Sequence, residues 1–209
     1  MSNYSLEIKN LTKNFGRRLI FRDINYLVSS ASIVGISGNN GSGKSTFMKI
    51  IAGVLSPNKG EVIHSLNGKK VINDKLFNHI GFVSPYLVLY EEFSAEENLI
   101  IFSKIRGINY DSDYIKLLFE KMNLFNRRRD AVKTYSSGMK QRLKYLFALM
   151  HKPELLLLDE PTSNLDNEGK ETVYNLVNEY SKDQIVIIAS NEEQDLKLCG
   201  DIIYLENYK

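Results

Sequence analysis

Three features that would place a chain outside the cell or in a membrane are missing from this sequence. Its 209 residues include a single cysteine, Cys199, so no disulfide can form within the chain and a reducing compartment is favoured. The apolar runs extend over only a few residues, whereas a membrane-spanning helix needs about 20. The chain also begins without the basic and apolar segments of a secretory signal. The sequence therefore predicts a soluble, cytoplasmic protein.

A strong charge bias and low-complexity segments are absent as well. Lysine and arginine total 27 against 25 aspartates and glutamates, a net charge of +2, so the bulk charge does not indicate nucleic-acid binding. A hydrophobic content of 43% is ordinary for a folded protein and excludes a disordered or collagen-like chain. At about 150 residues per domain, the length predicts one domain, residues 1–209.

The order of short apolar segments predicts an α/β core. Strands are expected at residues 6–9, 20–28 and 33–36. The continuous apolar runs at 155–158 and 185–189 are typical of parallel strands covered on both faces. Between these two runs an amphipathic helix completes a βαβ unit. Its apolar face is formed by Val173, Leu176, Val177 and Tyr180.

The middle of the chain has helical periodicity and is expected to be an insertion into this core at about residues 85–150. Ser94 and Glu97 have the spacing of a capping box at the start of a helix. Two further helices are predicted from apolar residues that share one face. They are Tyr114, Leu117, Leu118, Met122 and Phe125 for the first, and Met139, Leu143, Leu146, Phe147 and Met150 for the second.

Residues 38–46, GNNGSGKST, match the pattern of a phosphate-binding loop between a predicted strand and a predicted helix. Glycines let successive backbone N–H groups turn toward phosphate oxygens, and the helix N-terminus adds positive potential. Lys44 would reach the β- and γ-phosphates, and Ser45 would bind Mg²⁺. A chance glycine-rich turn would match in about one chain in a hundred of this length. The predicted nucleotide ligands are Gly38, Asn39, Asn40, Gly41, Ser42, Gly43, Lys44, Ser45 and Thr46.

Two carboxylates follow the apolar run LLLL at residues 155–158. Parallel α/β sheets place their ligands at the carboxyl ends of their strands, where Asp159 and Glu160 emerge. Asp159 suits a Mg²⁺ role through a bound water, and Glu160 is placed to polarise the attacking water. The alternative interpretation is a solvated acidic pair without a catalytic role. The presence of the phosphate loop favours the functional interpretation.

Three more segments accompany these motifs in a fixed order. They are KNFG at residues 13–16, YSSGMKQR at residues 135–142 and EPTSNLD at residues 160–166. Together the five motifs resemble those of the ATP-binding cassette (ABC) family. The resemblance implies an α/β fold with a P-loop NTPase core, an N-terminal β-subdomain and the helical insertion as a second subdomain. It also implies that Phe15 stacks on adenine.

The resemblance further implies a head-to-tail dimer that holds ATP between the phosphate loop of one copy and the signature segment of the other. Ser136, Ser137 and Gly138 stand in that signature, and Ser136 and Gly138 would donate hydrogen bonds to the γ-phosphate. Read from the residues alone, the same three positions fit a cap of the helix over residues 139–150. Both interpretations can hold together.

Two positions depart from the family pattern. Ser84 stands where the family usually has a glutamine near Mg²⁺, and the shorter serine would reach the ion through a water. Asn191 stands where the family usually has a histidine, and its amide can donate a hydrogen bond but cannot titrate. These differences bear on the rate of hydrolysis more than on ATP binding. The predicted catalytic residues are Lys44, Glu160 and Asn191.

The main functional hypothesis is ATP hydrolysis, with ATP and Mg²⁺ as ligands, that drives a separate membrane transporter subunit. The chain would then lie at the inner face of the cell membrane, held there by its partner. The alternative is a soluble ABC-type ATPase that remodels nucleic-acid or ribosome complexes, although such proteins usually carry two cassettes or a long coiled coil. For the basic triplet at residues 127–129, a solvated turn is favoured over contact with a partner or lipid headgroups. Cys199 is expected to pack, and His64, His79 and His151 to be scattered without metal-ligand spacing.

Overall fold

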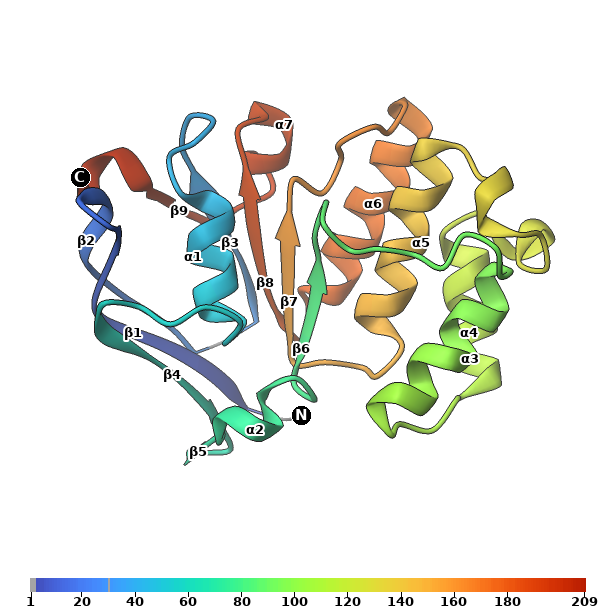
Figure 1. Ribbon diagram of the computed structural model, residues 1–209, viewed down its shortest axis with the longest axis horizontal. Helices are drawn as coiled ribbons and strands as arrows, with labels where there is room; N and C mark the ends of the chain where they lie inside the picture. The colour runs from blue at the N-terminus through green and yellow to red at the C-terminus, as the bar shows by residue number, and fades with distance from the viewer. Residues whose placement is uncertain (1–2, 30) are drawn as a thin grey trace.

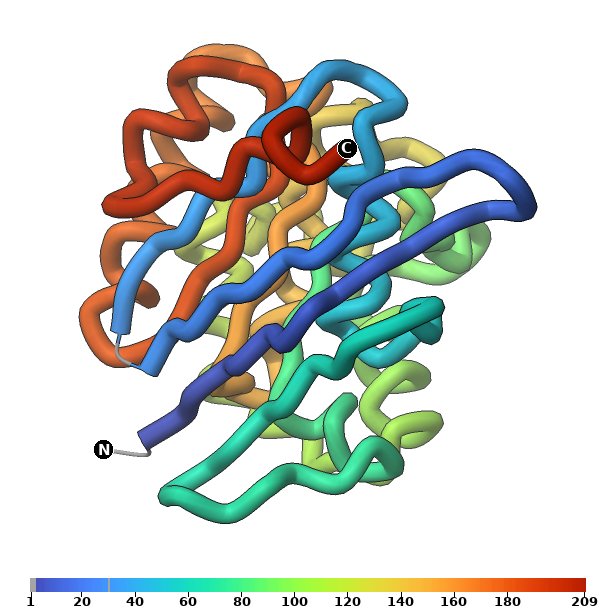
Figure 2. Tube along the Cα trace, turned by 90° about the vertical axis from the view of Figure 1, so that its left-hand side faces the viewer, coloured from blue at the N-terminus to red at the C-terminus, as the bar shows by residue number. Residues whose placement is uncertain are grey.

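The computed structural model describes residues 3–29 and 31–209 and contains two β-sheets (Figures 1 and 2). The larger sheet is parallel, with the strand order β6-β7-β8-β3-β9. Its strands are β3 (Ser32–Ser37), β6 (Ile80–Val83), β7 (Leu155–Asp159), β8 (Ile185–Ser190) and β9 (Asp201–Tyr204). The smaller sheet is antiparallel, in the order β2-β1-β4-β5. Its strands are β1 (Tyr4–Phe15), β2 (Arg18–Val28), β4 (Lys59–Leu66) and β5 (Lys69–Lys70).

Both faces of the parallel sheet are covered, as the continuous apolar runs predict. Leu155 and Leu157 of β7 pack into a core shared with the antiparallel sheet and helix α1 (Lys44–Ile51). Leu156 and Leu158 point the other way, into a core built with the helices. Because successive side chains alternate between faces, one strand joins both cores. The longer helices on that second side are α3 (Ala95–Arg106), α4 (Ser112–Lys121), α5 (Ser137–Leu149) and α6 (Asn167–Tyr180).

The helices α3, α4 and α5 follow β6 and precede β7, within the interval assigned to the insertion. The capping box at the start of α3 is confirmed: Glu97 N–H donates to Ser94 Oγ at 3.2 Å, and Ser94 N–H donates to Glu97 Oε2 at 2.8 Å. Two helices of one turn complete the fold, α2 (Asn73–Leu76) and α7 (Glu193–Leu196).

One helix is shorter than predicted, and its buried face matches the predicted one only in part. Helix α4 ends at Lys121 because Asn123 adopts a left-handed conformation, with φ of 53°, just past its end. Leu117 is 43% exposed, and Phe125 lies in a separate 3-10 turn, so the prediction of one apolar helical face that includes both is wrong. The buried face consists of Ile115, Leu118 and Phe119, with Met122 at the cap.

The antiparallel sheet is larger than the sequence predicts, because β4 and β5 have no counterpart among the expected strands. Most residues of β4 are exposed or half-buried, which leaves no clear alternation of apolar and polar residues. The parallel strands β3, β7 and β8 all end at one edge of their sheet, and the phosphate loop and the acidic pair follow there (Figure 1).

Candidate nucleotide-binding site

The phosphate loop connects β3 to the N-terminus of α1. At Gly43 the backbone adopts a φ of 111°, and an added Cβ would lie 2.4 Å from Ile20 Cγ2, so a side chain does not fit there. The loop is further closed by the Ser42 N–H, which donates to Asn39 O at 2.9 Å. The tight turn brings backbone donors and the start of a helix to one point, which is the arrangement that binds phosphate groups.

The Lys44 side chain is only 6% exposed and is held at this loop by two contacts. Its ammonium donates to Gly38 O at 2.7 Å and lies 3.4 Å from Glu160 Oε1. The lysine therefore bridges the phosphate loop and the acidic pair.

A hollow of about 350 Å³ opens beside the loop and is lined by seven of its nine residues, from Asn39 to Thr46. Phe15 also lines it; this side chain is 51% exposed, and the Lys13 ammonium lies 5.0 Å from its ring centroid. Three lining residues, Arg18, Ile20 and Tyr86, were not predicted as site residues from the sequence. Only the fold brings them here, and no motif contains any of the three.

Asp159 has the environment expected of a ligand for a cation. Its side chain is fully buried, and neither carboxylate oxygen has a hydrogen-bond partner within the described residues. Burial raises the pKa of the Asp159 carboxyl, while the positive charges of Lys44 and Lys49 act in the opposite direction. Buried carboxylates are normally paired, so this one fits Mg²⁺, which takes oxygen ligands.

Glu160 follows directly and is anchored through its backbone. It adopts a φ of 51°, and its N–H donates to Ala189 O at 2.8 Å. Burial raises the pKa of its carboxyl, Lys44 opposes this shift, and Asp159 and Asp195 add to it. The loop beyond it is held from helix α5, where Gln141 Nε2 and Tyr145 OH both donate to Pro161 O.

The two positions that depart from the family pattern have different surroundings. Asn191 Nδ2 donates to Asn40 Oδ1 at 3.3 Å, which places this side chain against the phosphate loop. Ser84 is buried, and its hydroxyl accepts the Tyr86 N–H at 3.3 Å. Ser84 does not line the hollow beside the phosphate loop; it lines a neighbouring apolar hollow instead.

The signature residues are not brought to the phosphate loop within one chain. Ser136 caps α5 by accepting the Met139 N–H at 3.2 Å, so the cap interpretation is confirmed. Ser136 and Ser137 are exposed, Gly138 is half-buried, and none of the three lines the hollow described above.

Glu206 is a neighbour of the phosphate loop that sequence reasoning missed. It lies in the 3-10 turn at the C-terminal end (Leu205–Tyr208), and its Oε1 accepts the Asn39 N–H at 2.8 Å. Figure 2 shows this turn beside the loop. Hydrogen bonds from the backbone N–H groups of Asn39 and of Glu206 itself lower the pKa of the Glu206 carboxyl. Because 167 positions separate the partners, no local pattern signals the contact.

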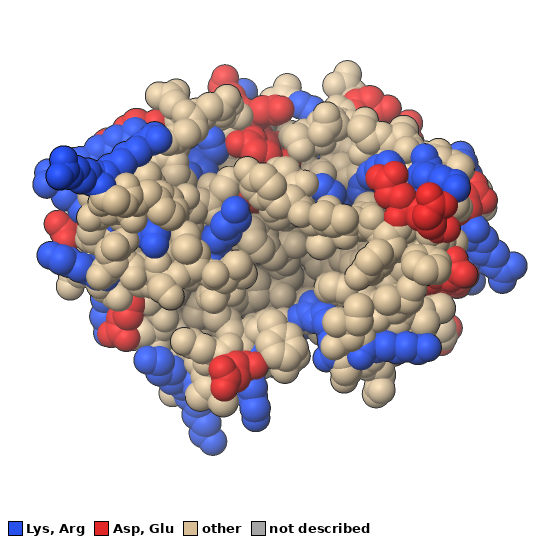
Figure 3. Space-filling model, in the orientation of Figure 1, with Lys and Arg blue, Asp and Glu red and all other residues tan. Residues whose placement is uncertain are grey.

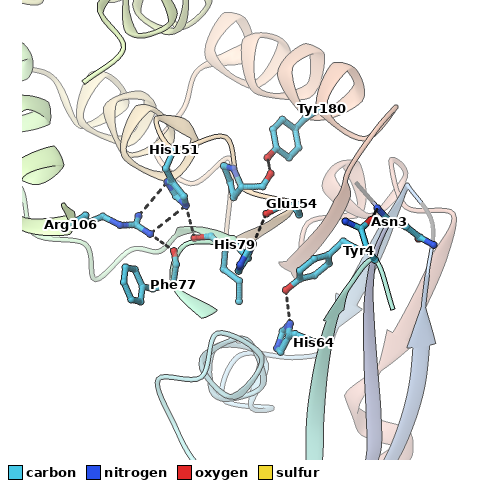
Figure 4. A network of polar contacts seen from close by, with 12 residues as sticks. Asn3, Tyr4, His64, Phe77, His79, Arg106, His151, Glu154 and Tyr180 are labelled. Carbon is cyan, nitrogen blue, oxygen red and sulfur yellow. Dashed lines mark hydrogen bonds and ion pairs between the residues drawn. The ribbon is translucent and has the colours of Figure 1, made fainter. Parts of the chain in front are cut away.

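The sequence predicted scattered histidines, but the three lie together in one polar region (Figure 4). This region is at the end of the parallel sheet opposite to the phosphate loop. Their ring nitrogens bond to Tyr4, Glu154, Arg106 and backbone carbonyls. Within the described part of the chain no group of three histidine, cysteine, aspartate or glutamate side chains is placed to hold a metal ion.

The remaining expectations concern packing and the basic triplet. Cys199 is half-buried against the helical core, and burial raises the pKa of its thiol to about 12. Arg127 pairs with Asp130, while Arg128 and Arg129 both lie within 4.0 Å of Glu96, so each arginine of the triplet has an acidic neighbour.

A family model described as ABC transporter matches residues 21–163, more than half of the chain. This chain belongs to the ABC transporter family. It is 32% identical to the ABC transporter ATP-binding protein YybJ of Bacillus subtilis, over 97% of this chain and 93% of that protein. It is 33% identical to the lantibiotic transport ATP-binding protein SrtF of Streptococcus pyogenes, over 95% of this chain and 85% of SrtF.

A third relative is the bacitracin transport ATP-binding protein BcrA of Enterococcus faecalis, 34% identical over 96% of this chain, which spans 65% of BcrA. Among solved structures, a putative ABC transporter ATP-binding protein from Pyrococcus furiosus superposes with a TM-score of 0.84 at 26% identity, covering 98% and 99% of the two chains. The ABC-type ATPase fold with its β-subdomain and helices is thus confirmed.

As an ABC transporter ATP-binding protein, this chain is an ATPase whose activity is coupled to transport. Among the helices described here, none combines the length and the apolar character needed to cross a bilayer.

Proposed function

We propose that this ABC subunit hydrolyses ATP with Mg²⁺ in a head-to-tail homodimer and thereby drives a separate membrane subunit at the inner face of the cell membrane. The relatives named as transport ATP-binding proteins support this role over the remodelling of nucleic-acid or ribosome complexes. Charge supports it too, because a net +2 gives no general attraction to nucleic acid.

ATP binding is assigned to one end of the parallel sheet. The N–H groups of the phosphate loop and the Lys44 ammonium receive the phosphates, and the exposed ring of Phe15 stacks on adenine. The Ser45 hydroxyl and Asp159 would hold Mg²⁺, and Ser84, which lines the neighbouring hollow, would reach the ion only through a water. Bound there, Mg²⁺ neutralises charge on the phosphate oxygens.

Hydrolysis is assigned to the loops after β7 and β8. Glu160 accepts a proton from the attacking water, and Lys44, 3.4 Å away, keeps this carboxylate oriented toward the phosphate loop. Asn191 donates its amide N–H to the γ-phosphate or to the water. Its contact with Asn40 supports this assignment because it already places the amide beside the phosphate loop.

The observation that carries the dimer is the separation of the signature from the phosphate loop within one chain. Ser136 and Ser137 are exposed at the N-terminus of the 13-residue helix α5. A second copy in head-to-tail orientation would bring this helix N-terminus, with its positive potential, to the γ-phosphate.

Glu160→Gln tests the proposed dimer. The amide keeps the shape of the side chain but cannot accept the proton, so turnover should fall about 10²–10⁴-fold. Unhydrolysed ATP should then hold two copies together, seen by gel filtration as a dimer with ATP and a monomer without it. Glu120→Gln, at an exposed position of α4, is the matched control and should behave as wild type. A Glu160→Gln variant that stays monomeric in ATP at micromolar concentration argues against the dimer.

Docking of the membrane subunit is assigned to an apolar hollow of about 520 Å³ between α1, β6, α3 and α5. The middle of the face in Figure 3 is hollowed and largely uncharged. Among the described residues that line the apolar hollow, Lys49 and Arg106 are the only charged ones. Tyr86 lines both this hollow and the one beside the phosphate loop, which gives a partner seated here contact with the nucleotide site. We assign the hollow to a segment of the membrane subunit.

Val54→Asp tests this docking site, because Val54 is 72% exposed at the rim and its replacement leaves the core intact. The share of tagged chain that sediments with membranes should fall about tenfold, because docking would bury the new carboxylate without a partner. Leu27→Asp, at a 62% exposed position of the antiparallel sheet, is the control and should sediment as wild type. Equal sedimentation of the Val54→Asp chain and wild type would move the docking site elsewhere.

A further inference from the structure

Asp195 is a buried carboxylate to which the scheme above gives no role. It lies in the short helix α7 and is only 1% exposed. None of the ion pairs found within residues 3–29 and 31–209 involves it. A carboxylate removed from water without a cation is costly, so other groups must compensate for its charge.

Three hydroxyl groups compensate, and they come from three segments. Thr162 Oγ1 and Tyr174 OH donate to Oδ1 of Asp195 at 2.9 and 2.8 Å, and Ser190 Oγ donates to Oδ2 at 2.7 Å. Thr162 lies two residues beyond Glu160 in the loop after β7, Ser190 ends β8, and Tyr174 belongs to α6. One carboxylate therefore ties together the two loops that carry the proposed hydrolytic side chains.

The Ser190 hydroxyl has two carboxylates in reach but only one proton. Its oxygen lies 2.7 Å from Asp195 Oδ2 and 3.5 Å from Glu160 Oε2, and it accepts the Glu192 N–H at 3.0 Å. The shorter contact is the stronger hydrogen bond, so the proton points to Asp195. Glu160 Oε2 is then left without a donor from Ser190.

We propose that Asp195 is a positioning residue for hydrolysis, which fixes the loops after β7 and β8 to each other and draws the Ser190 proton away from Glu160. This role rests on the proposed function of Glu160. A carboxylate that already accepts a hydrogen bond is a weaker acceptor for the proton of the attacking water. Because Asp195 acts through its neighbours, its loss should lower kcat and leave the KM for ATP nearly unchanged.

Asp195→Asn is the first test. The carboxamide oxygen can still accept from Thr162 and Tyr174, but its NH₂ group presents donors to Ser190, so the Ser190 proton turns toward Glu160. We expect kcat to fall about tenfold to a hundredfold while the KM for ATP changes by less than about twofold. An unchanged kcat, or a KM that rises as much as kcat falls, would overturn the proposal.

A second substitution distinguishes the effect of the redirected Ser190 proton on kcat from the effect of lost packing around Asp195. Adding Ser190→Ala to Asp195→Asn removes the misdirected donor, so kcat should recover at least about threefold over the single variant. A further fall in the double variant overturns the proposal. Tyr174→Phe is the matched variant: it removes a donor to the same carboxylate without redirecting Ser190, and it should lower kcat less than Asp195→Asn does.

Two controls keep the outcomes distinguishable. Thermal unfolding and titration with a fluorescent ATP analogue show whether each variant is folded. If Asp195→Asn is not folded, the Ser190→Ala variant tests the proposal instead. A kcat of Ser190→Ala as low as that of Glu160→Gln would make Ser190 essential and overturn the proposal. Turnover that survives Glu160→Gln contradicts the proposed function itself. Turnover lost in Glu160→Gln but intact in Asp195→Asn contradicts only the positioning role.

Discussion

The two ends of the parallel sheet both bury polar side chains, but they treat them differently. At the amino ends of β6 and β7, Tyr4 OH donates to His64 Nδ1 at 2.7 Å, and His64 Nε2 donates to Ile51 O at 3.0 Å. Nearby, His151 Nε2 donates to Ile80 O at 3.0 Å, so this region resembles a completed network (Figure 4). At the carboxyl ends, both oxygens of Asp159 lack a partner.

Pairing, rather than burial, therefore distinguishes the histidine network from the Asp159 carboxylate. Buried polar groups that bond to one another stabilise the fold and leave no capacity for a ligand. Buried groups without partners cost stability until a ligand supplies the missing contacts. The histidine end belongs to the first kind, whereas the phosphate-loop end holds both kinds: Asp195 is paired and Asp159 is not.

Asp159→Asn should give the largest effect and break this contrast most clearly. Without the carboxylate, Mg²⁺-dependent hydrolysis should fall at least about 10²-fold. In the absence of nucleotide the same variant should be more stable than wild type by about 1 kcal/mol, or roughly 2–4 °C in Tm. The reason is that burial disfavours the charged form of the Asp159 carboxyl.

The matched control for that prediction is Tyr4→Phe at the histidine end. This change removes a paired hydroxyl and should lower stability by about 1 kcal/mol without changing turnover. Calorimetry and ATPase assays on both variants check the pair. If Asp159→Asn and Tyr4→Phe shift Tm in the same direction, pairing does not distinguish the two ends.

The pH dependence of stability should show an intermediate effect, carried by the histidine end. Burial lowers the pKa of His64 to about 4, and burial, with Arg106, lowers that of His151 to about 4. Unfolded histidines take up protons below about pH 6.5, where the folded ones stay neutral. Stability is therefore complete above this pH and is lost as the pH falls toward 4, by about 1 kcal/mol per histidine between pH 7 and 5.5.

His64→Gln checks this prediction, because glutamine can accept from Tyr4 and donate to Ile51 O without titrating. The loss of unfolding free energy between pH 7 and 5.5, measured in urea, should be smaller in the variant by about 1 kcal/mol. Equal losses in the two proteins would show that His64 does not carry the pH dependence.

Glu206→Gln should give the smallest effect and sharpens the description of the phosphate-loop end. The amide oxygen can still accept the Asn39 N–H, but the negative charge beside the loop is lost, so ATP should bind about twofold more tightly at low salt. Glu206→Ala loses the charge and the acceptor together and should gain less. Titration with a fluorescent ATP analogue measures both, and weaker binding by Glu206→Gln would contradict the electrostatic argument.

Local patterns were sufficient for the elements whose cause is local. The phosphate loop is recognisable because consecutive residues supply its turn, its donors and its lysine. The strands β7 and β8 are recognisable because burial on both faces requires an unbroken apolar run. The helix α4 was misjudged at its end because one residue, Asn123, takes a left-handed conformation that periodicity does not detect.

The sequence by itself determined the α/β core, the nucleotide motifs and the family to which they belong. The tertiary structure alone decided which distant side chains meet: Glu206 at the phosphate loop, the hydroxyl groups around Asp195, and the histidines at the far end of the sheet. The physical reason is that a motif encodes contacts between neighbours in the chain. A hydrogen bond across 167 positions depends on strand order and packing, to which every part of the fold contributes.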